Sequence, residues 1–209
     1  AEAPDRVWLA ERAGDGWRTV DYATALTQVS ALAGGLKGLG LKRGDCLLIL
    51  ARNRVDHALI CYAAMALGVA VAPVSPQYGL AGADLSRLAY DRCVLSPDAV
   101  YADDAAAFAG ALEADFLQGL PVVASANARP TDIAFASLLT SAPTAFVARP
   151  DDTAKLLLTS GSTGRPKAVI GLHRNIAFNA AQIAACFDDP DPPVVVNAAP
   201  WSHSLGANA

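Results

Sequence analysis

The sequence predicts an α/β fold, with a doubly wound, mainly parallel sheet and helices on both of its faces. Short, wholly apolar runs such as Cys46–Leu50 are typical of strands that are buried on both sides. Segments with helical periodicity separate these runs, as the crossovers between parallel strands require. The 209 residues are 53% hydrophobic and 17% charged. This composition excludes a disordered chain and is more apolar than that of an average soluble domain.

The first predicted helix spans 22–39. Asp21 can cap its start, and Gly40 suits the left-handed residue that ends a helix. The apolar side chains between them recur at helical spacing: Tyr22, Leu26, Val29, Leu32, Leu36 and Leu39. After a polar turn, Cys46–Leu50 is the first predicted strand of the sheet.

The second predicted helix spans 54–67, and a strand over Val69–Val74 follows it. Asn53 and Asp56, three residues apart, resemble a capping arrangement for the start of this helix. The stretch 58–83 carries no charge, but a glycine and two prolines interrupt it. A membrane-spanning helix needs about 20 continuous apolar residues. We therefore interpret the stretch as a buried helix and a buried strand.

Alternating helices and strands continue the pattern to residue 126 and complete a first α/β block. They are a helix over 83–91, a strand over Ala99–Tyr101, a helix over 104–113 and a strand over Pro121–Ala124. Residues 127–153 contain three prolines and predict an irregular connection. Residues 154–209 form the last block.

Charge and cysteine usage argue against several functions. The net charge is −4, and the 16 Lys and Arg residues are scattered, whereas nucleic-acid binding needs a basic patch and membrane-surface binding needs clustered cations on one helix face. The four cysteines are far apart, which argues against a disulfide framework or a zinc site. No signal peptide is recognisable at the first residues. We expect a cytoplasmic protein with no nucleic-acid or membrane partner.

The loop after the predicted strand 155–159 carries the clearest chemistry. Its glycines let successive backbone N–H groups converge on an anion, its hydroxyls add donors, and its lysine supplies a positive charge for phosphate. These residues are Thr159, Ser160, Gly161, Ser162, Thr163, Gly164 and Lys167. The spacing does not fit a Walker loop. A flexible linker is the alternative, but the loop joins two apolar stretches, and this favours phosphate binding.

This arrangement resembles the phosphate loop of the adenylate-forming enzymes, which include acyl-CoA synthetases, adenylation domains of peptide synthetases and luciferases. Their loop is a Ser/Thr/Gly-rich run that closes on Pro-Lys, and Thr159–Lys167 matches it throughout. Upstream, Gly38–Asp45 and Gly68–Pro76 resemble two further blocks of the superfamily. The fold implied is the incomplete N-terminal AMP-binding domain of such an enzyme, without its C-terminal domain.

Downstream of the loop, His173 and Asn175 also match the superfamily pattern. Two positions depart from it. Ala168 stands where most members have glycine, which would stiffen the exit of the loop. Leu172 replaces the usual Thr or Ser, so we expect the following helix to lack its ordinary cap.

The last stretch, a Pro-Trp-x-His-x-x-Gly-x-Asn pattern, is most similar to the feruloyl-CoA synthase branch, as is Ala72–Tyr78. The resemblance assigns the substrate pocket to Trp201, His203, Gly206 and Asn208. A flat aromatic acid needs an apolar slot with a few polar groups. The alternative is that Trp201 is an ordinary core residue and His203 a surface or core-satisfied side chain.

The resemblance implies an ATP-dependent acid–CoA ligase. A carboxylate attacks the α-phosphate of ATP–Mg²⁺, and the thiol of coenzyme A then displaces AMP from the acyl-adenylate. Residues 160–164 and Lys167 would hold the phosphates, and Thr159 would contact the magnesium ion. A fatty-acyl-CoA or amino-acid-adenylating enzyme and a non-catalytic nucleotide-binding module remain open alternatives.

The motif order leads us to expect that this chain is an N-terminal fragment and is inactive alone. Part of its high apolar content would then lie on an exposed face, or on one covered by self-association.

Overall fold

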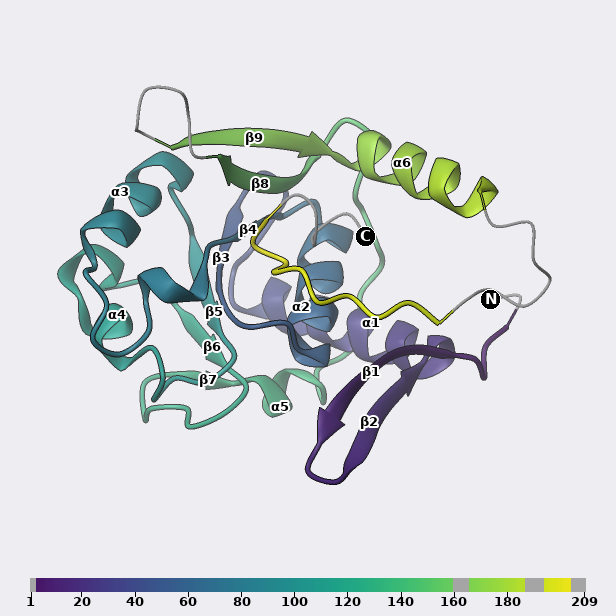
Figure 1. Cartoon of the computed structure of the whole chain (residues 1–209), viewed down its shortest axis with the longest axis horizontal. Helices are drawn as coiled ribbons and strands as arrows, with labels where there is room; N and C mark the ends of the chain where they lie inside the picture. The colour runs from purple at the N-terminus through teal and green to yellow at the C-terminus, as the bar shows by residue number, and fades with distance from the viewer. Residues whose placement is uncertain (1–2, 160–165, 187–193, 204–209) are drawn as a thin grey trace.

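The computed structural model describes residues 3–159, 166–186 and 194–203. Seven strands form one sheet in the order β7-β6-β5-β3-β4-β8-β9 (Figure 1). Every neighbouring pair is parallel except β8–β9, so the predicted fold class is confirmed. The strands are β3 Cys46–Leu50, β4 Ala70–Pro73, β5 Ala99–Ala102, β6 Val122–Ala124, β7 Ile133–Ala134, β8 Thr153–Thr159 and β9 Lys167–Leu172.

Helices cover both faces of this sheet, as Figure 1 shows. On one face lie α1 (Tyr22–Gly38), α2 (Val55–Ala66) and the short α5 (Phe135–Leu138). On the other lie α3 (Ser86–Leu95) and α4 (Ala109–Glu113). Two hydrophobic cores result, one on each side, and β3 is buried between them at all five of its residues.

The order of the strands reverses beside β3. The chain passes from β3 to β4 on one side and then crosses to β5 on the other. Ligands of open α/β sheets bind beyond the carboxyl ends of the strands at such a reversal. The segments that follow β3 and β5 are therefore the positions in this fold where a binding site is expected.

A β-hairpin precedes α1, and our sequence analysis did not predict it. Strands β1 (Val7–Ala13) and β2 (Gly16–Asp21) pair in an antiparallel manner through a two-residue turn. Gly14 in that turn has φ +56°, a left-handed conformation that glycine adopts without steric cost. A Gly-Asp pair between two strand-like runs is a recognised hairpin signal.

Several predicted boundaries are corrected by the structure. The helix expected over 104–113 is shorter, because the Asp104 side chain accepts hydrogen bonds from the N–H groups of Ala106 and Ala107 and forms a turn there. The connection 127–153 is not wholly irregular, since it contains β7 and α5. Two short 3₁₀ helices, η1 (Pro76–Tyr78) and η2 (Asp115–Leu117), also interrupt predicted loops.

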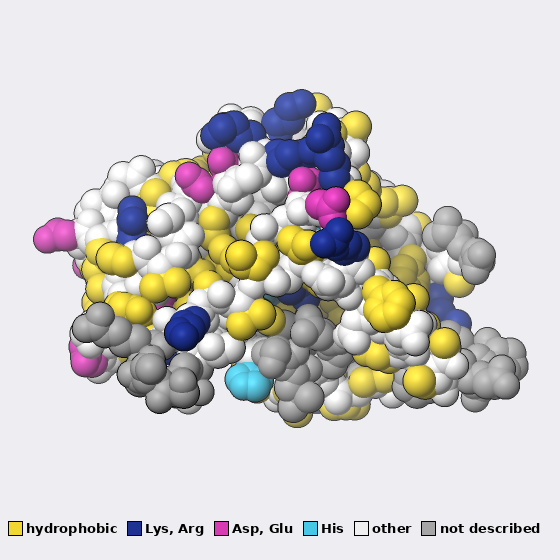
Figure 2. All heavy atoms as spheres, turned by 90° about the horizontal axis from the view of Figure 1, so that it is seen from above, with side chains coloured by type: hydrophobic (Ala, Val, Ile, Leu, Met, Phe, Trp, Pro, Cys, Tyr) yellow, Lys and Arg dark blue, Asp and Glu magenta, His cyan; other side chains and the backbone are white. Residues whose placement is uncertain are grey.

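Helix α6 (His173–Ala185) follows β9 and has no buried residue. Its Phe178 is 69% exposed, and Ile170 of the adjoining strand β9 is 62% exposed. Figure 2 looks onto this side of the molecule and shows hydrophobic side chains spread over it beside groups of Lys and Arg. Among the described residues, no helix combines the length and the apolarity that crossing a bilayer would require.

Candidate functional site

The two ends of the predicted phosphate loop lie side by side on neighbouring strands. Thr159 ends β8 and Lys167 begins β9, and the two residues are cross-strand partners. The Thr159 hydroxyl donates to the Lys167 carbonyl over 3.3 Å, and both residues are exposed. Five of the predicted loop residues lie outside the described residues: Ser160, Gly161, Ser162, Thr163 and Gly164.

A strand, and not a helix, follows this loop. Anion-binding loops that lead into a helix gain from the N–H groups and the dipole at the helix start. Since Lys167 begins a strand in the described part of the chain, an anion would depend on the N–H groups, the hydroxyls and the Lys167 ammonium group and not on a helix that starts at this lysine. Pro166, which has no N–H to offer, is buried directly before the lysine.

The predicted substrate residues are only partly described. Trp201 is half-buried, and its ring packs edge-on against the ring of His57, with centroids 5.1 Å apart. His203 is exposed, and its backbone N–H donates to the carbonyl of Pro200 over 3.0 Å. Gly206 and Asn208 lie outside the described residues. Trp201 is therefore partly exposed, and its ring contacts a buried side chain of α2.

Asn53 binds the backbone beside Trp201 and does not cap α2, so our capping prediction for it is wrong. Its Nδ2 donates to the carbonyl of Ala199 over 2.9 Å, and its Oδ1 accepts from the N–H of Trp201 over 3.0 Å. The cap comes from β1 instead, where Glu11 Oε2 accepts from the N–H of Val55 over 3.1 Å. A side chain from a distant strand cannot be recognised as a cap from the local sequence.

His57, which the sequence indicated as a packing residue, is 3% exposed. Its Nδ1 lies 3.1 Å from the carbonyl of Arg52, and because a carbonyl only accepts, Nδ1 carries the proton. Burial is the main cause that lowers the pKa of His57 to about 4; the hydrogen bond to Arg52 and the charge of Asp103 oppose it, and the charge of Lys155 adds to it. Burial also lowers the pKa of the Lys155 ammonium group. The imidazole is thus neutral under Trp201 at ordinary pH.

His173, expected to be structural, begins α6. Burial lowers its pKa, opposed by Asp152 and by a hydrogen bond to the carbonyl of Met65. As expected, Leu172 supplies no side-chain cap to this helix. The Asn175 side chain still accepts from the N–H of Leu172 over 3.1 Å, which preserves half of a capping box.

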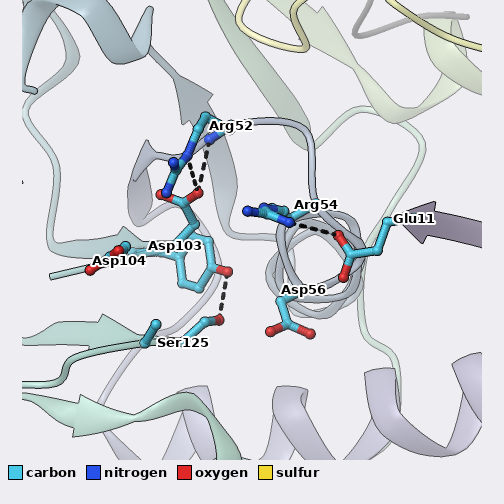
Figure 3. Close-up of a pocket in the computed structure, with 9 residues that line it drawn as sticks. Glu11, Arg52, Arg54, Asp56, Asp103, Asp104 and Ser125 are labelled. Atoms are coloured by element: carbon cyan, nitrogen blue, oxygen red, sulfur yellow. Dashed lines mark hydrogen bonds and ion pairs between the residues drawn. The ribbon is translucent and has the colours of Figure 1, made fainter. Parts of the chain in front are cut away.

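A polar cavity of about 220 Å³ lies at the carboxyl ends of β3, β5 and β6 and was not predicted. Figure 3 shows that opposite charges face each other around it. Arg52 Nε contacts Asp103 Oδ2 at 2.8 Å, while the guanidinium group of Arg54 approaches Glu11 at 3.9 Å. Its lining residues are Glu11, Arg52, Arg54, Asp56, Tyr101, Asp103, Asp104, Ser125 and Ala126.

This cavity joins segments that are far apart in the sequence. At its base, the Tyr101 hydroxyl and the Ser125 hydroxyl are 2.8 Å apart. Behind the lining residues Glu11 and Asp56, Arg18 of β2 contacts both of these carboxylates. The ion pairs hold the hairpin against the start of α2 and fix the segment after β3. The charged residues directly after the apolar runs of β3 and β5 were the sequence signal from which this cavity could have been predicted.

Within the described part of the chain, no three His, Cys, Asp or Glu side chains gather in a way that could hold a metal ion. The Thr159 hydroxyl is exposed at the end of β8 and makes one long hydrogen bond. Magnesium commonly takes one or two protein oxygens together with substrate phosphates and water. A hydroxyl in this position fits that mode of binding, with the phosphates supplying other ligands.

Comparison with known proteins agrees with the fold. The sequence profile of the family described as "AMP-binding enzyme" matches residues 1–209. A 4-coumarate–CoA ligase-like protein of Oryza sativa subsp. japonica is 33% identical over 79% of this chain and 26% of its own length. A feruloyl-CoA synthase of an Amycolatopsis species is 26% identical over 90% of this chain and 35% of its own length.

A solved structure resembles the whole chain at the level of fold. It is a fatty acyl-adenylate ligase from L. pneumophila in complex with acyl adenylate and pyrophosphate. The TM-score is 0.78 at 22% identity, over 98% of this chain and 34% of the other. The chain spans about a third of the length of the curated relatives that it matches.

Proposed function

Because the chain belongs to the AMP-binding enzyme family, we propose that it is the N-terminal part of an ATP-dependent acid–CoA ligase. The intact enzyme would activate a carboxylic acid as an acyl-adenylate and transfer the acyl group to coenzyme A. Its small-molecule partners would be the acid, ATP with Mg²⁺, and coenzyme A.

One structural observation carries this proposal. The Thr159–Lys167 pair lies at the carboxyl end of β8, and Asn53 holds Trp201 at the carboxyl end of β3. Since β3, β4 and β8 are parallel neighbours, both features belong to the same edge of the sheet. A phosphate-binding loop and an aromatic wall on one edge suit the joining of ATP to an organic acid.

The first reaction step joins the acid to the nucleotide. A carboxylate oxygen of the acid attacks the α-phosphorus of ATP, a P–O bond forms, and the bond to the leaving pyrophosphate breaks. Lys167 would hold the β- and γ-phosphates with the loop residues 160–164, and Thr159 would contact a magnesium ion, which neutralises phosphate charge. Such positioning and charge neutralisation supply most of the catalysis in phosphate chemistry.

The second step transfers the acyl group. The sulfur of coenzyme A attacks the acyl carbon, AMP leaves, and the thiol proton is released. Neither step needs a protein nucleophile.

We propose an aromatic acid of the feruloyl type as the substrate. The support is the Pro-Trp-x-His pattern, the half-buried ring of Trp201 and the feruloyl-CoA synthases among the similar proteins. His203 would orient the carboxylate, and Gly206 and Asn208 would complete the pocket. A panel of aromatic, fatty and amino acids in ATP–pyrophosphate exchange tests this choice. A preference for fatty or amino acids would refute it.

The phosphate-binding role is tested in the complete gene product. Lys167→Ala is expected to slow ATP–pyrophosphate exchange by about 100-fold, the order of effect of removing one preorganised charge-stabilising group. Lys37→Ala removes a lysine from the last turn of α1, away from the loop, and is the matched control. Equal rates for Lys167→Ala and the wild type would contradict the role.

A non-catalytic nucleotide-binding module is the second candidate, because the match to the AMP-binding enzyme family covers residues 1–209 without assigning a reaction to them. A gene product that binds ATP but catalyses no exchange with any acid of the panel would support it. We expect the isolated 209-residue chain to make no acyl-CoA. Acyl-CoA synthesis by that chain alone would refute this expectation.

We further propose a cytoplasmic location and self-association. Free thiols are the ordinary state in a reducing compartment. Ile170 of β9 and Phe178 of α6 are exposed apolar side chains, and such side chains, where they gather, mark protein interfaces. Sedimentation velocity should show a dimer that Ile170→Lys weakens. A monomeric wild type would refute self-association.

A further inference from the structure

We propose that Asn53 is a positioning residue for the acid-binding pocket. In this inference, which rests on the proposed function, the Asn53 side chain holds the segment 199–201 against the core. It thereby fixes the place of Trp201 and sets the affinity for the acid.

The geometry of the contact is that of a two-point clamp. The primary amide of Asn53 offers a donor and an acceptor side by side. Its donor bonds the Ala199 carbonyl at 2.9 Å, and its acceptor bonds the Trp201 N–H at 3.0 Å. The amide thus binds the backbone on both sides of residue 200, as a neighbouring strand would. These bonds join residues that are 146 and 148 positions apart.

Asn53 is held firmly on both sides. Before it, Arg52 contacts Asp103 through both its backbone N–H and its side-chain Nε, at 3.4 and 2.8 Å. After it, the N–H of Val55 is bound by Glu11. Figure 3 shows the side chains of Arg52 and Arg54 at the polar cavity, where their partners lie. These contacts therefore hold the backbone in place on both sides of Asn53.

The role of Asn53 can be separated from the stability of α2. An asparagine before a helix ordinarily accepts a backbone hydrogen bond and caps it. Glu11 takes over that task here, so both polar groups of the Asn53 amide serve the segment 199–201. Removing the Asn53 side chain should leave the start of α2 capped.

The segment that Asn53 holds needs such support. Residues 194–199 form neither helix nor strand, and Val194 and Val196 are 96% and 89% exposed. Next to the clamp, the Trp201 ring packs against the ring of His57, which lies in the first turn of α2. The clamp and this ring contact together define the position of the Trp201 side chain. A looser segment would present the aromatic wall in several positions and bind a flat acid less well.

The test compares three variants of the complete gene product. Asn53→Ala removes both bonds. Asn53→Asp keeps an acceptor for the Trp201 N–H but cannot donate to Ala199. Asn127→Gly is the matched control, because Asn127 also bridges two segments, with Asp104 at 2.9 Å. Its φ of +51° is one that glycine adopts easily.

Hydrogen exchange gives a readout that does not depend on activity. In the wild type and in Asn53→Asp, the N–H of Trp201 should exchange slowly, whereas in Asn53→Ala it should exchange at least tenfold faster. Helix α2 should keep its protection in all variants. Unchanged exchange at Trp201 in Asn53→Ala would overturn the inference.

Kinetics then test the link to the acid. Asn53→Ala should raise the KM for the acid about tenfold, equivalent to about 1.4 kcal/mol, with the KM for ATP unchanged. Asn53→Asp should lie between, and Asn127→Gly should match the wild type. Faster exchange at Trp201 with an unchanged KM for the acid would overturn the positioning role. A wild type that activates no acid would refute the proposed function, while the exchange data would still judge the clamp.

Discussion

Protonation of buried His57 should make the protein less stable as the pH falls from 7 to 5. The side chain is 3% exposed, and its neutral ring donates to the Arg52 carbonyl. Its pKa is about 4 in the folded protein against a normal 6.5. Because the folded pKa is the lower one, the stabilisation is present above pH 6.5 and is lost progressively toward pH 4.

The size of this effect follows from the two pKa values. Between pH 7 and pH 5 the unfolded chain gains about 0.7 of a proton at this position, and the folded protein gains about a tenth of one. Proton linkage then gives a loss of about 2 kcal/mol in the free energy of unfolding. Carboxylates with lowered pKa values, such as Asp21 and Asp104, act mainly below this window.

The variant His57→Asn isolates the effect. Its side-chain N–H can replace the Nδ1–H donor to the Arg52 carbonyl, but it does not titrate. Urea denaturation at both pH values should give a smaller pH-dependent loss for the variant, although its stability at pH 7 is lower because the ring contact with Trp201 is gone. His57→Asn/His173→Asn should flatten the dependence further, because burial also lowers the pKa of His173. A His57→Asn protein with the full wild-type pH dependence would refute this reasoning.

Three further predictions concern stability and reactivity. Gly34→Ala should cost about 3 kcal/mol, because the added Cβ would stand 1.9 Å from the carbonyl oxygen of Ala142; a melting temperature equal to the wild type would contradict this. Glu11→Ala should cost about 1–2 kcal/mol, since the first N–H of α2 loses its acceptor, and unchanged urea denaturation would count against it. Burial raises the pKa of the Cys46 and Cys61 thiols to about 12, so the native protein should label slowly at both with a thiol reagent; rapid labelling of either would disprove their burial.

Local sequence patterns were sufficient to predict the strands β3, β4, β5, β6 and β8, but not β7 or β9. Buried runs such as Cys46–Leu50 and a well-placed helix stop at Gly40, whose φ is +93°, depend on neighbours in the sequence. The predicted cap of α2 failed for the opposite reason. Asn53 has the right residue type and spacing, but Glu11 and the segment 199–201 compete for its position and its hydrogen bonds.

The candidate site was predictable only in part. Motif spacing identified Thr159 and Lys167, and the structure makes them cross-strand partners. It also indicated Trp201, but not its support by His57 and Asn53. Such support depends on which distant segments the fold brings together, and that information is absent from a local pattern.

Because β8 and β9 pair in an antiparallel manner, the register of the pair determines to which face of the sheet the Lys167 side chain points. Side chains alternate between the faces of a strand, so a shift of one residue turns each of them to the opposite face. A residue inserted between Thr159 and Lys167 would leave their pairing intact but would shift residues 160–164, which we propose to hold phosphate. A residue inserted within β9 would force either Lys167 or the residues near Leu172 onto the wrong side. We therefore expect natural length variation to be excluded from β9 as well as from the residues proposed to hold phosphate.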